Sequence, residues 1–370
     1  MKKKRNGIIA LIVLVVLIAA SIMYQFFRYD TYDVEATFER NDEDGTKYAN
    51  FDSNLIKYNA DGAFYTKEDG SLIWNISYEY TNPTLKMTKD YILLYDERGR
   101  GLELLDKKGS VLSLEMNMTI RRAAVSNTGV VAVLMEEGHI SFLQMYSPNG
   151  TKIAEGTIYP QNSGFPIALA LSSDAKLLMV SELDINNKNM TSRIVFYNFG
   201  SVGQNESDNI VASYIYEDEI IPDVCFMDDD TPVAFGGSAV RLYSKSEKPK
   251  EGKIISYDSK IKSIENNGSC FIVISENNDP EDSNAFLLEI FNKNGRRVGH
   301  RSFDYNYDNV SILPGPQIVI IDGQTINFYS RIGVNSYSGD MESNVYAVLS
   351  RGSNSYTIIE NNQSSRIRLR

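Results

Sequence analysis

The sequence predicts an all-β propeller domain behind a single N-terminal transmembrane helix, with eight blades expected and seven as the alternative. Three observations support this fold class: a long apolar run near the N-terminus, short strand-like segments separated by turn dipeptides, and a strand pattern that repeats about every forty residues. The expected organisation is a cytoplasmic basic tail (1–6), a signal-anchor helix (7–27), a linker (28–44) and an extracytoplasmic propeller (45–370).

The first element is the apolar run from Gly7 to Met23, in which Ser21 is the only polar residue. At ~1.5 Å of helical rise per residue, Gly7 to Phe27 is long enough to span the ~30 Å hydrocarbon core of a bilayer. Four cations precede the run and mostly acidic residues follow it, which keeps the N-terminus in the cytoplasm. The alternative is a cleaved signal peptide, for which Ala19-Ala20-Ser21 is a poor cleavage site. We therefore expect a single-pass protein of the cell membrane, held in lipid by residues 7–27.

Composition sets limits on the exported part. The chain has a net charge of −11, and leaving out the four cations of the tail gives −15 for the remainder. Nucleic acid is not an expected partner, because a domain with this negative charge repels phosphate backbones. Cys225 and Cys270 lie in apolar strand-like runs and are expected to be buried free thiols, with one disulfide as the alternative. With only His139 and His300, zinc sites and histidine-based catalytic triads are hard to assemble.

From about residue 45 onward, short segments rich in β-branched and aromatic residues alternate with turn dipeptides such as Asn149-Gly150 and Asn294-Gly295. Each repeating unit contains a strand that ends in a polar turn, an apolar second strand, a third strand that ends in an aromatic residue, and a less apolar fourth strand. This is the four-stranded sheet of a propeller blade. The units are expected at residues 45–80, 84–118, 119–160, 165–216, 220–257, 260–306, 308–341 and 343–370.

The last unit has room for only three strands, and Tyr32 to Phe38 forms a strand-like segment with no partner of its own. We expect this segment to supply the outer strand of the last blade, because that pairing removes a free sheet edge.

These hairpin patterns, over about residues 45 to 370, resemble the WD40-like and quinoprotein-like β-propeller superfamilies. More narrowly, the whole chain resembles a family of single-pass, membrane-anchored bacterial propellers with no assigned function. The resemblance implies a fold and no activity.

No motif of the sequence indicates an enzyme, a cofactor or a metal. Quinone-dependent propeller dehydrogenases resemble one another in a cofactor-stacking tryptophan, a vicinal cysteine pair and a Ca²⁺ site. This chain has no adjacent cysteines, and its one tryptophan, Trp74, is expected to pack within a blade. Asp228-Asp229-Asp230 and the stretch from Glu276 to Asp282 lack the spacing of a calcium loop and are expected to be solvated turns.

Tyrosines recur where the outer strand of one blade leads to the inner strand of the next. Because these connections reach the same face of a propeller, and tyrosine combines rigid contact area with a polar tip, they are the predicted ligand-binding residues. The alternative is that they pack between blades. The tyrosines are Tyr78, Tyr80, Tyr159, Tyr214, Tyr216, Tyr305 and Tyr307, and the carboxylates beside them are Glu79, Glu217, Asp218, Glu219, Asp304 and Asp308.

The expected function is that of a non-catalytic binding or scaffolding propeller at the cell surface, which engages a protein or glycan partner through one face. Two alternatives stay open: an envelope enzyme that acts on glycan through two loop carboxylates, and a structural assembly factor of a membrane complex.

Overall fold

The computed structural model describes most of the chain, and the described residues fall into two compact units. The smaller unit consists of the N-terminal segment up to residue 41 together with 262–292 and 296–370, and the larger of 42–261 with 293–295. The described residues are 14–15, 26–40, 42–43, 45–52, 54–67, 70–185, 190–315, 317–352, 354–361 and 363–370.

The predicted transmembrane run from Gly7 to Phe27 lies largely outside the described residues. Among the residues that are described, no helix has both the length and the apolar character needed to cross a membrane.

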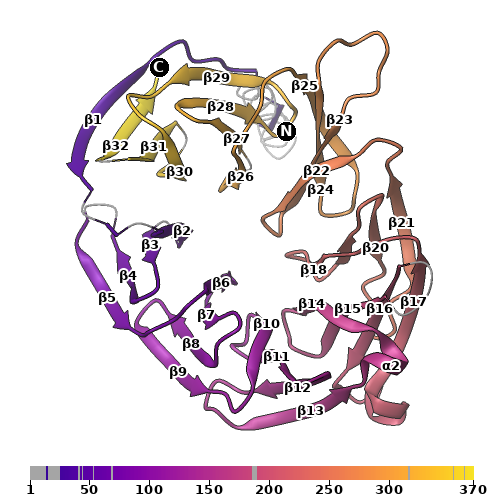
Figure 1. Ribbon diagram of the computed structural model, residues 1–370. Coiled ribbons are helices and arrows are strands. Elements are labelled where there is room, and N and C mark those ends of the chain that lie inside the picture. The colour runs from indigo at the N-terminus through magenta and orange to yellow at the C-terminus, as the bar shows by residue number, and fades with distance from the viewer. Residues whose placement is uncertain are drawn as a thin grey trace, which may run out of the picture. The chain divides into compact units, whose positions relative to one another are not determined.

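The described part of the larger unit forms five four-stranded sheets, each with its strands in chain order (Figure 1). We number these blades along the chain. The first blade is β2 (Lys47–Phe51), β3 (Asn54–Tyr58), β4 (Gly62–Thr66) and β5 (Leu72–Ser77), and the second is β6 (Pro83–Met87), β7 (Ile92–Asp96), β8 (Gly101–Asp106) and β9 (Gly109–Glu115). The third is β10 (Thr119–Val125), β11 (Val131–Glu137), β12 (Ile140–Tyr146) and β13 (Lys152–Ile158). The fourth follows the short helix α2 (Pro160–Ser163) and is β14 (Phe165–Leu171), β15 (Leu177–Asp184), β16 (Thr191–Asn198) and β17 (Ile210–Glu217), with η1 (Gly203–Asn205) and η2 (Ser207–Asn209) before β17. The fifth is β18 (Asp223–Phe226), β19 (Pro232–Phe235), β20 (Ala239–Tyr243) and β21 (Glu251–Ser256).

The described part of the smaller unit forms three further four-stranded sheets, which brings the blades to the predicted eight. The sixth blade is β22 (Ile261–Asn266), β23 (Cys270–Glu276), β24 (Phe286–Asn292) and β25 (Arg297–Phe303), and the seventh is β26 (Asn309–Leu313), β27 (Gln317–Asp322), β28 (Thr325–Ser330) and β29 (Asn335–Asp340). The eighth contains β30 (Val345–Ser350), β31 (Ser355–Glu360), β32 (Gln363–Leu369) and, from the other end of the chain, β1 (Tyr32–Glu39).

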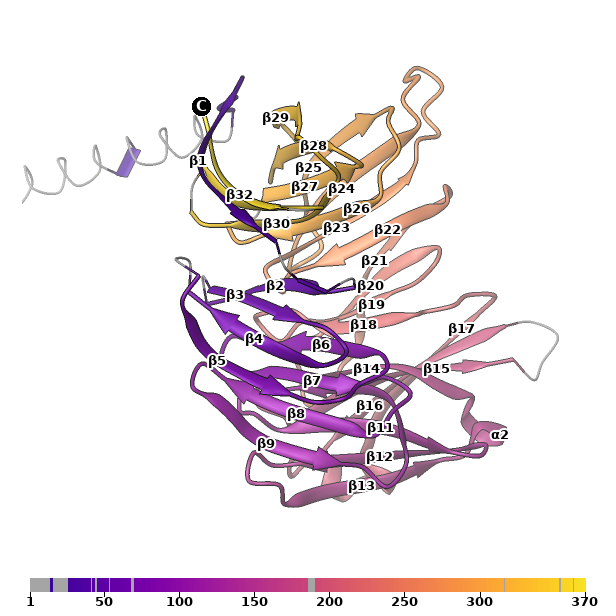
Figure 2. The ribbon, with the colours of Figure 1, turned by 60° about the vertical axis from the view of Figure 1, so that its left-hand side comes forward.

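The predicted role of the N-terminal strand is confirmed. β1 pairs antiparallel with β32, from Tyr32 opposite Leu369 to Glu39 opposite Gln363, with an irregularity between Val34 and Ala36. Figure 2 shows the indigo β1 alongside the yellow β32. A strand from one end of the chain therefore completes the sheet made by the other end.

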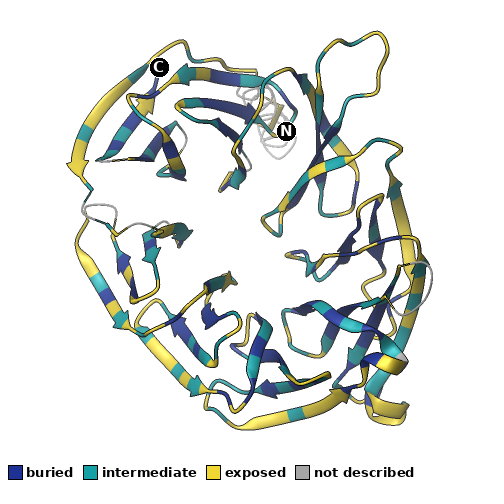
Figure 3. Ribbon diagram, in the orientation of Figure 1, coloured by how far each residue is buried: buried dark blue, intermediate teal, exposed yellow. Residues whose placement is uncertain are grey.

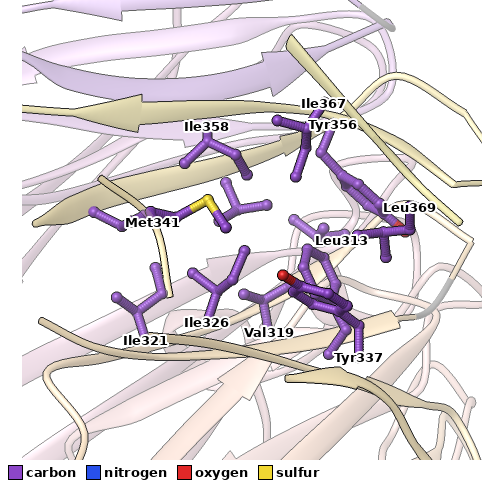
Figure 4. Close-up of a cluster of buried hydrophobic side chains, with 13 residues drawn as sticks. Leu313, Val319, Ile321, Ile326, Tyr337, Met341, Tyr356, Ile358, Ile367 and Leu369 are labelled. Atoms are coloured by element: carbon purple, nitrogen blue, oxygen red, sulfur yellow. The ribbon is translucent and has the colours of Figure 1, made fainter. Parts of the chain in front are cut away.

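Within each unit the core lies between neighbouring blades, because the middle strands are apolar on both faces. β7 is buried along its whole length, whereas outer strands such as β5 and β9 are largely exposed (Figure 3). Between the seventh and eighth blades, the rings of Phe328 and Tyr356 pack with 4.5 Å between their centroids, within a larger apolar cluster (Figure 4). Trp74 is a packing residue as expected: it lies in the apolar cluster between the first and second blades, and its indole N–H donates to the Asp106 carbonyl oxygen of β8 at 3.1 Å.

Both cysteines are free thiols, Cys270 buried and Cys225 half-buried. The prediction of free thiols is therefore confirmed and the disulfide alternative is wrong, whereas full burial holds for Cys270 and not for Cys225.

Candidate functional site

The structure places six of the seven predicted tyrosines against neighbouring strands. Tyr78 and Tyr80 stack on each other with 4.1 Å between ring centroids, and the Tyr78 hydroxyl donates to the Gly62 carbonyl oxygen at 2.9 Å. Tyr80 is 9% exposed, and its ring approaches Gly101 so closely that a Cβ at that position would lie 2.3 Å from the ring. These two tyrosines do share one side of the chain as alternation predicts, but that side faces the second blade.

The pairs in the later blades are also half-buried, and their hydroxyls are bonded. Tyr214 donates to the Pro249 carbonyl oxygen at 2.8 Å. In the smaller unit, the Tyr305 hydroxyl lies 2.7 Å from that of Tyr329, and the Tyr307 hydroxyl lies 2.8 Å from that of Ser263. This geometry favours packing between blades over a shared surface for these residues, and their ligand-binding role stays a prediction.

Tyr159 is the exception, with 51% of its surface exposed. It directly precedes α2, in the connection between the third and fourth blades. Gly164 ends this connection with a φ of +86°, and a Cβ there would lie 2.7 Å from the backbone carbon of Leu183. A glycine is therefore required at this position, and it holds the connection against the end of β15.

Four more exposed apolar side chains lie at the same end of the fourth blade. Ile185 and Met190 flank the paired residues Asp184 and Thr191 that end β15 and begin β16, and Ile215 lies on β17 opposite Arg193. Ile220 follows in the connection to the fifth blade. We call this group the blade-four surface: Tyr159 (51% exposed), Ile185 (56%), Met190 (51%), Ile215 (67%) and Ile220 (38%). Figure 1 labels the neighbouring elements α2, β15 and β17 of the fourth blade.

The connection that carries Ile220 is held by hydrogen bonds to buried groups of the fourth and fifth blades. The buried Ser192 hydroxyl donates to the Glu219 carbonyl oxygen at 2.8 Å and accepts from the Ile221 N–H at 3.0 Å. The Glu219 side chain is 6% exposed and accepts from the backbone N–H and the hydroxyl of Ser238, at 3.3 and 2.9 Å. Buried hydrogen bonds therefore hold the connection that presents Ile220.

Arg241 completes this support with a buried ion pair. Its Nη2 lies 2.5 Å from Glu219 Oε2, and its guanidinium stacks 4.2 Å from the Tyr216 ring centroid. Tyr216 in turn bonds to the hydroxyl of Tyr243 at 2.7 Å and donates to Glu251 at 2.6 Å. Burial, followed by the neighbouring Tyr243, raises the pKa of Tyr216, so its hydroxyl stays protonated. Tyr216 is thus a packing and hydrogen-bonding residue under the surface.

A second buried pair lies on the other face of the fourth blade. Glu182 is fully buried, and its Oε2 accepts from Arg193 at 2.6 and 2.7 Å, while Oε1 has no hydrogen-bond partner in the described structure. Burial, opposed only partly by Arg193, raises the pKa of Glu182 from 4.5 to about 7.

We expect the Glu182 carboxyl to make the protein less stable as the pH rises. The folded state keeps the proton up to a pKa of about 7 while the unfolded chain releases it near 4.5, so the stability falls across that interval. At ~1.4 kcal/mol per pKa unit the loss is on the order of 3 kcal/mol. Glu182→Gln should therefore raise the urea midpoint at about pH 8 and leave it unchanged at about pH 4. A wild-type protein that is the more stable of the two at the higher pH would contradict this.

Carboxylates border the blade-four surface. Asp184 is half-buried at the end of β15, and Glu217 and Asp218 are exposed where β17 ends. The surface therefore combines an apolar centre with an acidic rim.

Two carboxylates that the sequence places beside the tyrosines bind groups of the protein itself, Glu219 in a buried position and Asp308 in an exposed one. The Glu219 carboxylate pairs with Arg241 and accepts from the Ser238 hydroxyl, and Asp308 accepts from the Gly323 N–H at 2.8 Å. A polar acceptor in a blade connection can thus bind backbone N–H groups of the neighbouring hairpin. Sequence reasoning also missed Glu182, whose only signal is an acidic residue inside an apolar run.

The described residues contain no cluster of three or more histidine, cysteine, aspartate or glutamate side chains that would hold a metal ion. In the predicted turn of the fifth blade, Asp229 accepts from Thr231 at 2.8 Å and pairs with Lys245 at 2.9 Å, and Asp230 accepts from the Ser173 N–H at 2.8 Å. These carboxylates stabilise turns.

Four-stranded meander blades in series define the chain as a β-propeller protein. Residues 25–369 match the family of unknown function DUF5711, and the chain belongs to that family. No curated protein matches it.

Solved structures support the same fold. BamB from Moraxella catarrhalis is 12% identical, with a TM-score of 0.51 over 92% of this chain and 100% of BamB. The Pan2 WD40 domain of Neurospora crassa is 9% identical, with a TM-score of 0.50 over 91% of this chain and 95% of that domain. Apo AztD from Citrobacter koseri is 9% identical, with a TM-score of 0.52 over 86% of this chain and 91% of AztD. At such low identities the likeness shows the propeller fold alone.

Proposed function

We propose that this protein is a membrane-tethered binding propeller whose blade-four surface engages a partner protein outside the cytoplasm. The tether is the apolar run from Gly7 to Phe27, whose length and flanking charges are those of a signal anchor. The likeness to BamB and to a WD40 domain agrees with this proposal at the level of the fold.

The observation that carries the proposal is the gathering of exposed apolar side chains at one end of the fourth blade. Large apolar residues scattered singly are ordinary on protein surfaces, whereas a contiguous group rimmed by polar residues marks interaction sites. Ile215, Ile185 and Met190 are all more than half exposed and lie on three adjacent strand ends. The acidic rim favours a partner with apolar anchors surrounded by basic residues, since complementary charges steer and orient association.

Site-specific photo-crosslinking in living cells tests this function. A photoreactive phenylalanine at Ile215 should give one discrete adduct with a partner. The same probe at Ile153 on β13 or Ile254 on β21 should give none, although these isoleucines are 52% and 47% exposed on neighbouring outer strands. Once the partner is identified, Ile215→Ser should weaken its binding about tenfold or more, the loss typical of an interface hot spot. The urea midpoint should stay nearly unchanged, because the side chain is exposed.

Cell fractionation completes the test. The adduct should sediment with membranes and should disappear when intact protoplasts are treated with external protease. Adducts of equal intensity at all three positions, or no adduct at Ile215, would refute the blade-four surface as the binding site. A protease-resistant adduct would refute the extracytoplasmic location.

A further inference from the structure

We propose that the outer strand of the sixth blade, β25, binds an extended phosphate-bearing polymer. This inference goes beyond the proposed function, because it concerns a surface in the other unit and a partner of different chemistry. Its basis is a local reversal of charge on an acidic protein.

The outer strands of the described blades differ sharply in charge. β25 contains Arg297 and Arg301 and no carboxylate, which gives it a charge of +2. β5, β13 and β21 are neutral, β9, β17 and β29 each carry −1, and β1 carries −3. β25 is therefore the only positively charged strand among the outer strands that the structure describes.

Two further arginines extend this positive charge. Arg296 directly precedes β25 and is exposed. The turn between β28 and β29 lies against β25, since a Cβ on Gly299 would lie 2.4 Å from the Ile332 carbonyl carbon and 2.8 Å from the Arg331 carbonyl oxygen. This close backbone contact requires glycine at 299 and places Arg331 beside the strand. We call Arg296, Arg297, Arg301 and Arg331 the arginine strip.

Most of the strip's charge is not neutralised by the protein. Arg297 pairs with Glu289 at 2.5 Å, but within the described residues no ion pair or side-chain hydrogen bond engages Arg296, Arg301 or Arg331. All four residues are exposed. Several described arginines of other blades do meet carboxylates, as Arg193 meets Glu182 and Arg241 meets Glu219.

The shape and chemistry of the strip favour a polymer of phosphates. Guanidinium groups bind phosphate oxygens through paired N–H donors. From Arg297 to Arg301 the strand extends about 13 Å at ~3.3 Å per residue, which is too long for one phosphate and suits a chain of them. Single-stranded nucleic acid is usually held by stacking on exposed aromatic rings. The neighbouring Phe303 is buried and the Tyr305 hydroxyl is bonded to Tyr329, so a polymer without bases fits better.

Positive side chains on an outer strand can also serve to prevent edge-to-edge association of sheets. That role would need charge but no ligand, and it predicts a change in aggregation rather than in affinity.

Titration of the full chain in non-ionic detergent with inorganic polyphosphate distinguishes these roles. The triple variant Arg296→Gln, Arg301→Gln, Arg331→Gln should bind polyphosphate at least about tenfold more weakly at low salt than the wild type. Each single replacement should reduce the slope of log affinity against log salt by about one. Lys250→Gln is the matched control, because Lys250 is exposed and precedes the outer strand β21 as Arg296 precedes β25. It should change neither quantity.

Three results would overturn the proposal: equal affinity in the triple variant and the wild type, aggregation of the variant without loss of affinity, and strip-dependent binding of DNA or anionic vesicles in preference to polyphosphate. The Ile215→Ser variant should keep full polyphosphate binding. The polyphosphate proposal and the proposed role of the blade-four surface can therefore be refuted independently of each other.

Discussion

A chain that begins at Arg40 should be much less stable than one that begins at Tyr29, by ~5 kcal/mol or more, and it should aggregate. The shorter chain lacks β1, so the whole β32 ladder loses its partner and the eighth blade has three strands. It also loses Tyr32, whose ring packs edge-on against Tyr337 in the apolar cluster between the seventh and eighth blades. Thermal unfolding and size-exclusion chromatography of the two truncated chains measure the effect.

Two controls separate the causes of this loss. Both truncated chains lack residues 1–28, so the apolar run does not contribute to the difference. Tyr32→Ala in the longer chain removes the ring and keeps the strand, so it should cost part of the stability and leave the protein monomeric. The exposed pair of Arg368 and Glu35, 2.6 Å apart, should contribute little, because solvent screens it. If the chain begun at Arg40 were as stable and as monomeric as the longer one, β1 would be dispensable.

This strand illustrates what the sequence could predict. Short apolar segments and turn dipeptides are local signals, and Gly150 indeed has the positive φ that an Asn-Gly turn needs. The pairing of β1 with β32 is not local. It could still be predicted, because the last unit lacks one strand and the N-terminal segment is a strand without a partner. The blade number follows from the same repeat.

The direction in which side chains point could not be predicted in the same way. Alternation correctly places Tyr214 and Tyr216 on one side of β17 and Ile215 on the other. In a propeller, however, both faces of a blade meet neighbours, so alternation does not tell which side becomes exposed. The tyrosines face the fifth blade and Ile215 is left 67% exposed, which moves the candidate surface from the tyrosines to the residue between them.

Buried polar pairs were beyond sequence reasoning for a related reason. Glu219 lies in a blade connection, among the carboxylates that the sequence places beside the predicted binding tyrosines, and Arg241 lies on a strand of the next blade. Only the packing of the two blades brings their side chains within 2.5 Å. A charge that looks like part of a binding face is in fact part of its support.

Glu219→Ala should be one of the most destabilising single substitutions near the blade-four surface, at about 3–5 kcal/mol. The substitution leaves the Arg241 guanidinium buried without its carboxylate, and its Nε and Nη1 atoms already lack hydrogen-bond partners in the described structure. It also leaves the Ser238 hydroxyl, which donates to Glu219 at 2.9 Å, without its acceptor. Urea unfolding at neutral pH measures the loss.

A matched ion pair at the surface provides the control. Glu136 pairs with Arg121 on the third blade, where the arginine side chain is 41% exposed, so Glu136→Ala should cost only up to ~1 kcal/mol. The double variant Glu219→Met, Arg241→Met removes both buried charges and keeps their volume, so it should be more stable than Glu219→Ala alone. If Glu219→Ala and Glu136→Ala cost equally little, water or Glu251, which lies 3.8 Å from Arg241 Nε, compensates the arginine. The connection that presents Ile220 would then be held without the ion pair, by the Ser192 and Ser181 hydroxyls and by the Gly237 N–H, which donates to the Ile220 carbonyl oxygen at 3.0 Å. The buried pair of Glu219 and Arg241 would then not be part of what supports the blade-four surface.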